Sequence, residues 1–109
     1  VKIATGSDVG TGTYGAGNPN KITLNFTPKI VIISTSSFSP APRGQNGWSD
    51  GMIAVYPATK VFVYDSVTAA SELTWGDDYF SWYTQAAGTN AEKAQLNKSG
   101  TTYGWLILG

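Results

Sequence analysis

The carboxylates of this chain are the first residues to consider for catalysis. Asp77 and Asp78 are adjacent, and Asp50 and Asp65 stand elsewhere in the sequence. Glycoside hydrolysis needs two carboxyl groups that face one bond across about 5 to 9 Å, whereas neighbouring residues of a strand point to opposite faces of a sheet. Because Asp is also a preferred turn residue, we assign Asp77 and Asp78 to a turn, with calcium binding by their oxygens as the alternative.

Other catalytic chemistries lack their usual groups. The 109 residues include no His and no Cys, which removes the commonest general base, the usual partner of a Ser nucleophile and any thiolate or disulfide. Ser and Thr are abundant, but no Ser-x-x-Lys motif offers a Lys base. We therefore expect a protein that is not an enzyme.

The segment Gly10–Gly15 has the spacing G-x-G-x-x-G of a dinucleotide-binding turn. That motif binds pyrophosphate only where a strand leads into the N-terminus of a helix, and Pro19 with the strand-like segment from Lys21 leaves no such helix. We interpret Gly10–Gly15 as a glycine-rich turn, and we expect no cofactor and no resident metal.

The charges of the chain are few and balanced. Seven basic and seven acidic residues give a formal net charge of zero, and no two basic residues are adjacent. Binding to a phosphate backbone normally needs a concentrated basic face, and crossing a bilayer needs about 20 consecutive apolar residues, which this sequence lacks. We expect neither a nucleic-acid partner nor membrane insertion.

The long segment 36–50 contains the main candidates for ligand binding. Pro, Gly, Ser and Asn residues prevent regular structure there, and loops of this length are often functional. A Trp ring among guanidinium, amide and carboxylate groups suits a saccharide, which presents apolar C–H faces and a rim of hydroxyls. The alternative is that Trp48 anchors the loop on its own domain. The candidate ligand-binding residues are Trp48, Arg43, Asn46 and Asp50, with Tyr79 and Tyr83 as further exposed aromatics.

The elements that position these residues are short strands. Residues 21–27 alternate strictly between polar and apolar, which predicts a half-buried strand. The β-branched run Ile30–Ile33 predicts a central strand covered on both faces. The further expected elements are the hairpins 52–56 with 60–65 and 72–76 with 79–83, a helix over 91–97 and a closing strand over 101–108.

These elements predict an all-β fold, an antiparallel β-sandwich of about seven to eight strands, jelly-roll or H-type-lectin-like, with one short helix near 91–97. Three Trp residues, Trp75, Trp82 and Trp105, are expected in the core or between the sheets. Residues 1–109 fit one domain. Because the chain starts abruptly at Val1 with a strand-like pattern, we expect it to be excised from a longer protein.

Six segments together carry a resemblance to a known family. They are Thr11–Gly15, Asn18–Asn20, Ile22–Ile33, Leu73–Trp75, Tyr79–Tyr83 and Gln95–Tyr103. In this order they resemble the C-terminal receptor-binding or tip domains of bacteriophage and prophage tail proteins. The resemblance implies display on the virion at the end of a tail fibre, facing outward, as a homotrimer that contacts a bacterial cell-surface saccharide or protein.

Three functions are compatible with these observations. The first is a phage tail receptor-binding module, an adhesin for a bacterial surface glycan or protein. The second is a purely structural domain that caps or trimerises a tail fibre, with apolar aromatics buried between subunits. The third is a lectin-like carbohydrate-binding module of a secreted bacterial protein.

We predict that Trp48→Ala weakens the binding of the chain to bacterial cell-wall polysaccharide by about 2- to 10-fold, because an aromatic stacking contact contributes about 0.5–1.5 kcal/mol. Titration calorimetry with the purified polysaccharide measures the change in Kd. Unchanged binding by the variant would exclude Trp48 from the binding site.

Overall fold

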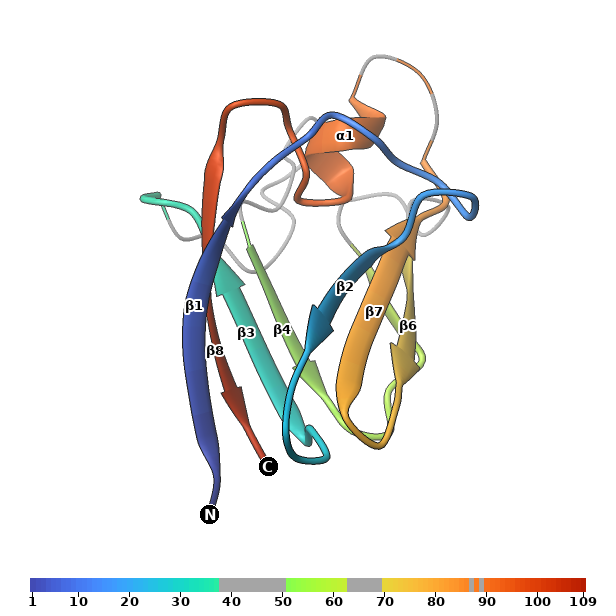
Figure 1. Cartoon of the computed structure of the whole chain (residues 1–109). Helices are drawn as coiled ribbons and strands as arrows, with labels where there is room; N and C mark the ends of the chain where they lie inside the picture. Colours follow the sequence, from blue (N-terminus) through green and yellow to red (C-terminus); the bar gives the residue numbers. More distant parts are fainter. Residues whose placement is uncertain (38–50, 63–69, 87, 89) are drawn as a thin grey trace.

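The computed structural model describes residues 1–37, 51–62, 70–86, 88 and 90–109. These residues form eight strands in two four-stranded sheets and one short helix. The two antiparallel sheets face each other as a sandwich (Figure 1), so the predicted all-β sandwich is confirmed. Sheet A has the strand order β1-β8-β3-β4, and sheet B has the order β2-β7-β6-β5. The strands are β1 Ile3–Val9, β2 Asn20–Thr23, β3 Ile30–Ser34, β4 Gly51–Val55, β5 Lys60–Phe62, β6 Ala70–Trp75, β7 Tyr79–Thr84 and β8 Thr102–Leu108.

Sheet A is built around β3, which pairs with β8 on one side and with β4 on the other. Its β-branched residues suit the pleated surface of a strand. Val31 and Ile33 point inward and are buried, whereas Ile30 and Ile32 point outward and are half-buried. β3 is therefore the central strand that its sequence predicts, but sheet B covers only its inner face.

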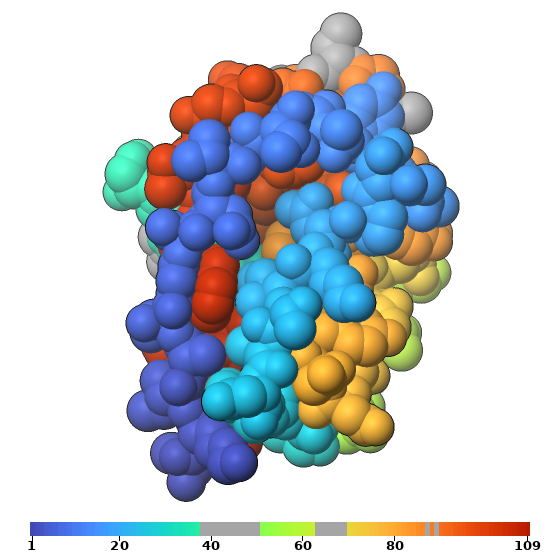
Figure 2. Space-filling model, in the orientation of Figure 1, coloured from blue at the N-terminus to red at the C-terminus, as the bar shows by residue number. Residues whose placement is uncertain are grey.

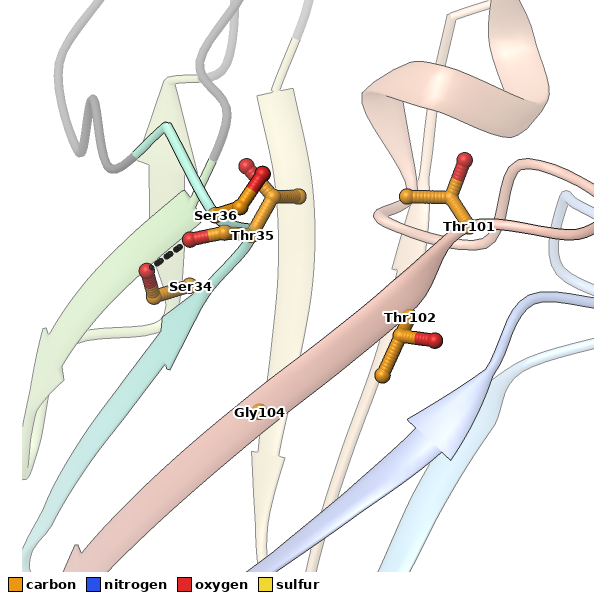
Figure 3. Close-up of a pocket in the computed structure, with 6 residues that line it drawn as sticks. All are labelled: Ser34, Thr35, Ser36, Thr101, Thr102 and Gly104. Atoms are coloured by element: carbon orange, nitrogen blue, oxygen red, sulfur yellow. Dashed lines mark hydrogen bonds between the residues drawn. The ribbon is translucent and has the colours of Figure 1, made fainter.

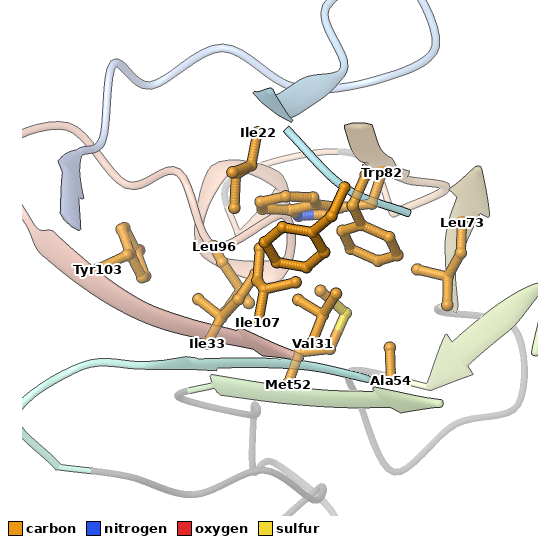
Figure 4. Packing of buried hydrophobic residues seen from close by; sticks show 12 residues of the cluster. Ile22, Val31, Ile33, Met52, Ala54, Leu73, Trp82, Leu96, Tyr103 and Ile107 are labelled. Carbon is orange, nitrogen blue, oxygen red and sulfur yellow. The ribbon is translucent and has the colours of Figure 1, made fainter. Parts of the chain in front are cut away.

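The hydrophobic core lies between the inner faces of the two sheets (Figure 4). Sheet A contributes Val31, Ile33, Met52, Ala54, Tyr103 and Ile107, and sheet B contributes Ile22, Leu73, Phe80 and Trp82. The ring of Phe80 lies 4.7 Å from that of Trp75 and 5.6 Å from that of Trp82, centroid to centroid. Trp105 packs against the same cluster from β8. The three described Trp residues thus lie in or against the core, as predicted.

The chain crosses from sheet A to sheet B between β1 and β2, at the end of the sandwich where the helix α1 lies (Figure 1). The fully buried side chain of Gln95 holds this crossing. Its Oε1 accepts the backbone N–H of Gly15 at 2.8 Å and that of Thr84 in β7 at 3.0 Å. Its Nε2 donates to the carbonyl of Asn18 at 2.8 Å and to Oδ1 of Asn20 at 3.0 Å. Every donor and acceptor of this buried amide therefore has a partner.

A second buried amide, that of Asn97, binds the first half of the crossing. Its Oδ1 accepts the backbone N–H of Thr11 at 3.0 Å, and its Nδ2 donates to the carbonyl of Thr13 at 2.9 Å. The backbone carbonyl of Asn97 accepts the N–H of Gly12 at 2.7 Å. The segment Gly10–Gly15 therefore wraps around Asn97 and leads into β2, and no helix follows it.

The helix is shorter than predicted. The sequence predicts a helix over 91–97, but α1 covers only Ala91–Ala94. It ends in a Schellman motif, in which the N–H of Asn97 donates to the carbonyl of Glu92 at 2.9 Å. Leu96 takes the left-handed conformation, with φ 58°, at a position that Gly usually occupies. No helix among the described residues is long and apolar enough to cross a membrane.

The first predicted hairpin is wrong, because β4 and β5 lie in different sheets. The N–H of Tyr56 still donates to the carbonyl of Lys29 on the side of sheet A, at 2.8 Å. Three residues later, the carbonyl of Thr59 accepts the N–H of Leu73 in sheet B, at 2.9 Å. The short connection is therefore an arch between the sheets, and its length alone did not distinguish an arch from a hairpin.

The second predicted hairpin is confirmed. β6 and β7 pair in antiparallel register up to Trp75 and Phe80. Asp77 and Asp78 lie exposed in the turn between them, which is closed by the N–H of Gly76 donating to the carbonyl of Tyr79 at 2.9 Å.

We predict that Gln95→Leu lowers the free energy of unfolding by about 2–4 kcal/mol. The Leu side chain has a similar size, but it leaves at least two buried backbone groups unpaired at about 1–3 kcal/mol each. Urea unfolding followed by Trp fluorescence measures the difference. The matched control is Gln85→Leu, since the side chain of Gln85 is exposed; equal stability of the two variants would contradict a structural role for the Gln95 amide.

Candidate functional site

Four of the six predicted site residues, Arg43, Asn46, Trp48 and Asp50, lie outside the described residues. The sequence around them also has the pattern Gly-x-Ser-x-Gly at Gly47–Gly51. That pattern marks a Ser nucleophile where a His accepts its proton, and the chain contains no His.

The other two predicted residues, Tyr79 and Tyr83, share the outer face of sheet B, as their spacing in β7 predicts. Both rings are half-buried. Nζ of Lys21 lies 4.5 Å above the centroid of the Tyr79 ring, and Tyr83 pairs across the sheet with Glu72. Four residues of a strand span about 13 Å, so the two rings do not form one stacking platform.

A row of small residues crosses the outer face of sheet A. Side chains of residues paired in a sheet lie on the same face, and the register aligns Ser7 with Gly104, Gly104 with Ser34 and Ser34 with Gly51. No side chain in this row is larger than that of Ser. The row therefore forms a depression in a face whose neighbouring rows carry larger side chains.

This depression opens into a hollow of about 480 Å³ at the end of β3 and the start of β8. Figure 3 shows that Ser34, Thr35 and Ser36 lie on one side of the hollow and Thr101 and Thr102 on the other, with Gly104 between them. Ser36 is also the first residue of the predicted loop 36–50. The first residue of that predicted loop thus lines the hollow.

The hydroxyls of this hollow retain hydrogen-bonding capacity. Ser34 Oγ donates to the carbonyl of Thr35 at 2.6 Å, and Thr35 Oγ1 accepts the N–H of Ser37 at 3.3 Å. Within the part of the chain that the structure describes, the hydroxyls of Ser36, Thr101 and Thr102 have no hydrogen-bond partner. Each hydroxyl both donates and accepts, so the hollow suits a neutral ligand rich in hydroxyls.

A second hollow, of about 220 Å³, lies between the edge strands β1 and β2. Figure 2 shows these two strands with atoms of β8 visible between them. Its lining includes Asp8, Lys21, Asn20 and Asn97, but most of these groups already have partners. Asp8 Oδ2 accepts the indole N–H of Trp105 at 3.2 Å, and both amides belong to the crossing described above. This hollow therefore presents fewer unsatisfied groups to a ligand than the first.

No arrangement suited to a metal ion is found among the described residues. No three of their His, Cys, Asp or Glu side chains lie close enough together to hold an ion. Asp77 and Asp78 are a turn pair, and neither lines the hollow at Ser34 and Thr102. The described residues thus provide no geometry for the calcium alternative.

Comparisons with known proteins provide no further assignment. No protein-family model, no curated protein and no solved structure matches the chain.

The small residues that form the hollow can be read in the sequence, but the pattern within one strand does not show that they lie side by side. Ser34 and Gly104 lie at outward positions of strands that were predicted separately, β3 and β8. Only the register brings them together in one row, and register between strands about 70 residues apart does not follow from the pattern within each strand.

We predict that Gly104→Val fills the hollow without loss of stability. A Cβ on Gly104 would lie 3.9 Å from its nearest neighbours, and replacing Gly within a strand stabilises by about 0.5–1 kcal/mol. The contrasting variant is Gly6→Val on the inner face, where the new side chain would overlap the ring of Trp105 and cost about 1–3 kcal/mol. Urea unfolding compares the two, and a large loss of stability in Gly104→Val would show that the hollow is not open.

Proposed function

We propose that this chain is a non-catalytic binding module that recognises a bacterial surface saccharide in the hollow between Ser34 and Thr102. The observation that carries the proposal is a hollow whose described lining is uncharged and in which the hydroxyls of Ser36, Thr101 and Thr102 have no hydrogen-bond partner among the described residues. A monosaccharide unit of a glycan presents hydroxyls that can donate to and accept from such groups.

Apolar surface next to the hollow supports the same ligand class. Leu106 and Ile32 form the next row of the outer face, beside Gly104 and Ser34. A saccharide offers C–H faces as well as hydroxyls, so an apolar wall beside a hydroxyl-lined floor complements both parts of its surface.

The resemblance to phage tail C-terminal domains supports display of this module on a virion as an adhesin. A fibre that carries several copies would bind a surface with many identical glycans. Several weak sites acting together then give an avidity well above the affinity of one site. The proposal therefore does not require tight binding by the single chain.

A purely structural capping or trimerisation role is the second candidate. The specific observation in its favour is the apolar outer face of sheet A, because such a face is expected between subunits rather than in water. The two roles are compatible if the hollow stays open in the assembly.

We predict that Thr102→Val weakens binding to purified bacterial cell-wall polysaccharide by about 2- to 10-fold. This substitution keeps the side-chain shape and removes one hydroxyl, and a neutral hydrogen bond contributes about 0.5–1.5 kcal/mol. Titration calorimetry measures Kd, with Gly104→Val as the variant that blocks the hollow and abolishes binding.

The matched control is Thr74→Val. Thr74 is an exposed strand Thr on the outer face of sheet B, away from the hollow, so its substitution should leave Kd unchanged. If Gly104→Val binds the polysaccharide with the Kd of the wild-type chain, the saccharide binds elsewhere and this site is refuted. Failure of the wild-type chain to bind any polysaccharide on a glycan array would refute the function.

A further inference from the structure

The outer face of sheet A is apolar across all four of its strands. The register aligns two complete rows, Ile3 with Leu108, Ile30 and Val55, and Thr5 with Leu106, Ile32 and Ile53. Seven of these eight residues are Ile, Leu or Val. The remaining outward residues, Ser7, Val9, Gly51, Ser34, Thr102 and Gly104, are small or uncharged.

The side chains at the two edges of this face are open to solvent in the single chain. Ile3 on β1 is 61% exposed, and on β4 Ile53 is 46% and Val55 is 52% exposed. A strand with apolar residues on both faces is typical of a sheet covered on both sides. β3 and β8 have this pattern, yet sheet B covers only their inner faces.

The outer face of sheet B is different and serves as an internal reference. It presents the charged residues Lys21, Lys60 and Glu72 together with Thr23 and Thr74. Lys60 and Glu72 form an ion pair at 3.6 Å on this surface. Sheet B therefore has the alternation of a solvated face, and sheet A does not.

We propose that a second copy of this chain covers the outer face of sheet A. None of the outward residues of β1, β3, β4 and β8 is charged, and the chain has no formal net charge. Two identical copies therefore approach without like-charge repulsion. A partner that recognised this face by charge would find no group to pair with, whereas an identical apolar face is complementary to it.

The dimensions of the face fit a weak sheet-on-sheet contact. The strands of sheet A have five to seven residues. With a spacing of about 4.8 Å between strands and a rise of about 3.4 Å per residue, the face measures roughly 19 Å by 17 to 24 Å. Flat sheets pack face to face at about 10 Å. The resulting projected area is on the order of 300–450 Å² per copy, which lies below that of stable interfaces and in the range of weak, transient contacts, so we expect a Kd in the high micromolar range.

The apolar rows and the proposed saccharide hollow occupy different parts of the same face. Ile3, Ile30 and Val55 lie at one end of their strands, and the hollow at Ser34 and Thr102 lies at the other end. The contact therefore leaves the hollow at its margin. The inference deepens the structural role proposed above, which rests on the same apolar rows, and it is independent of the proposed saccharide site.

Sedimentation velocity of the wild-type chain between 1 µM and 1 mM, concentrations chosen about the expected micromolar Kd, tests the proposal. We expect a mass that rises with concentration from one chain to two or three. A mass of two chains indicates that identical faces meet about a two-fold axis, and a mass of three indicates that the face meets another surface of a neighbouring copy in a ring. Either result supports coverage by a second copy, provided that the variants below dissociate it.

The variants Ile53→Lys and Ile3→Lys place a charge at opposite edges of the face and should raise the Kd of self-association at least tenfold. Both side chains are exposed in the single chain, so the fold should persist; equal unfolding midpoints at low concentration verify this. Phe62→Lys is the matched control, because Phe62 is also 46% exposed but lies on the outer face of sheet B. A monomer at every concentration overturns the proposal and leaves the face to a different protein, as does association that persists in both variants.

Discussion

The fold depends on how the backbone N–H and carbonyl groups of the crossing between β1 and β2 find hydrogen-bond partners. A chain that passes from one sheet to the other cannot pair with a strand, so its N–H and carbonyl groups need other partners. Gln95 and Asn97 supply these partners from one short turn after α1. Because Gln95 also accepts the N–H of Thr84, the same amide joins the crossing, the helix and sheet B. The edge strands β1 of sheet A and β2 of sheet B are thereby fixed relative to each other at the end of the sandwich where α1 lies.

The hydrogen bonds of Gln95 and Asn97 explain several backbone conformations that are unfavourable or unusual by themselves. Leu96 adopts a left-handed φ of 58°, at a cost of about 1–2 kcal/mol, and burial of its side chain in the core offsets that cost. Gly10 has no room for a side chain, because a Cβ would overlap the carbonyl of Lys98. Gly12 and Gly15 both have φ near +90°. The spacing that resembles a nucleotide-binding turn is therefore what a tight passage over residues 95–98 requires.

The sequence predicts the parts of this fold that depend on local pattern. The β-branched run Ile30–Ile33 identified β3, and the pair Asp77 and Asp78 identified the turn between β6 and β7. The parts that depend on contacts distant in sequence were missed or wrong. α1 ends at Ala94, and Leu96 takes the left-handed position after it, where a Gly would have marked the end in the sequence. The arch at Pro57 differs from a hairpin only because β5 pairs in sheet B and not in sheet A. The predicted site residues Arg43, Asn46, Trp48 and Asp50 lie outside the described residues. The row of Ser34 and Gly104 appears only once the register is known.

The outer face of sheet A has rows of long and rows of short side chains, so a flat partner cannot contact all of it. Its Ile, Leu and Val side chains form two tall rows, whereas the row that includes Ser34 and Gly104 is low. A flat partner that rests on the tall rows does not reach the floor of the low one, because the difference in side-chain length leaves a gap there. Filling that gap would need a larger residue at Gly104, which the strand geometry accommodates. Small residues at these positions therefore keep a hydroxyl-lined space at the margin of a face that is otherwise suited to burial.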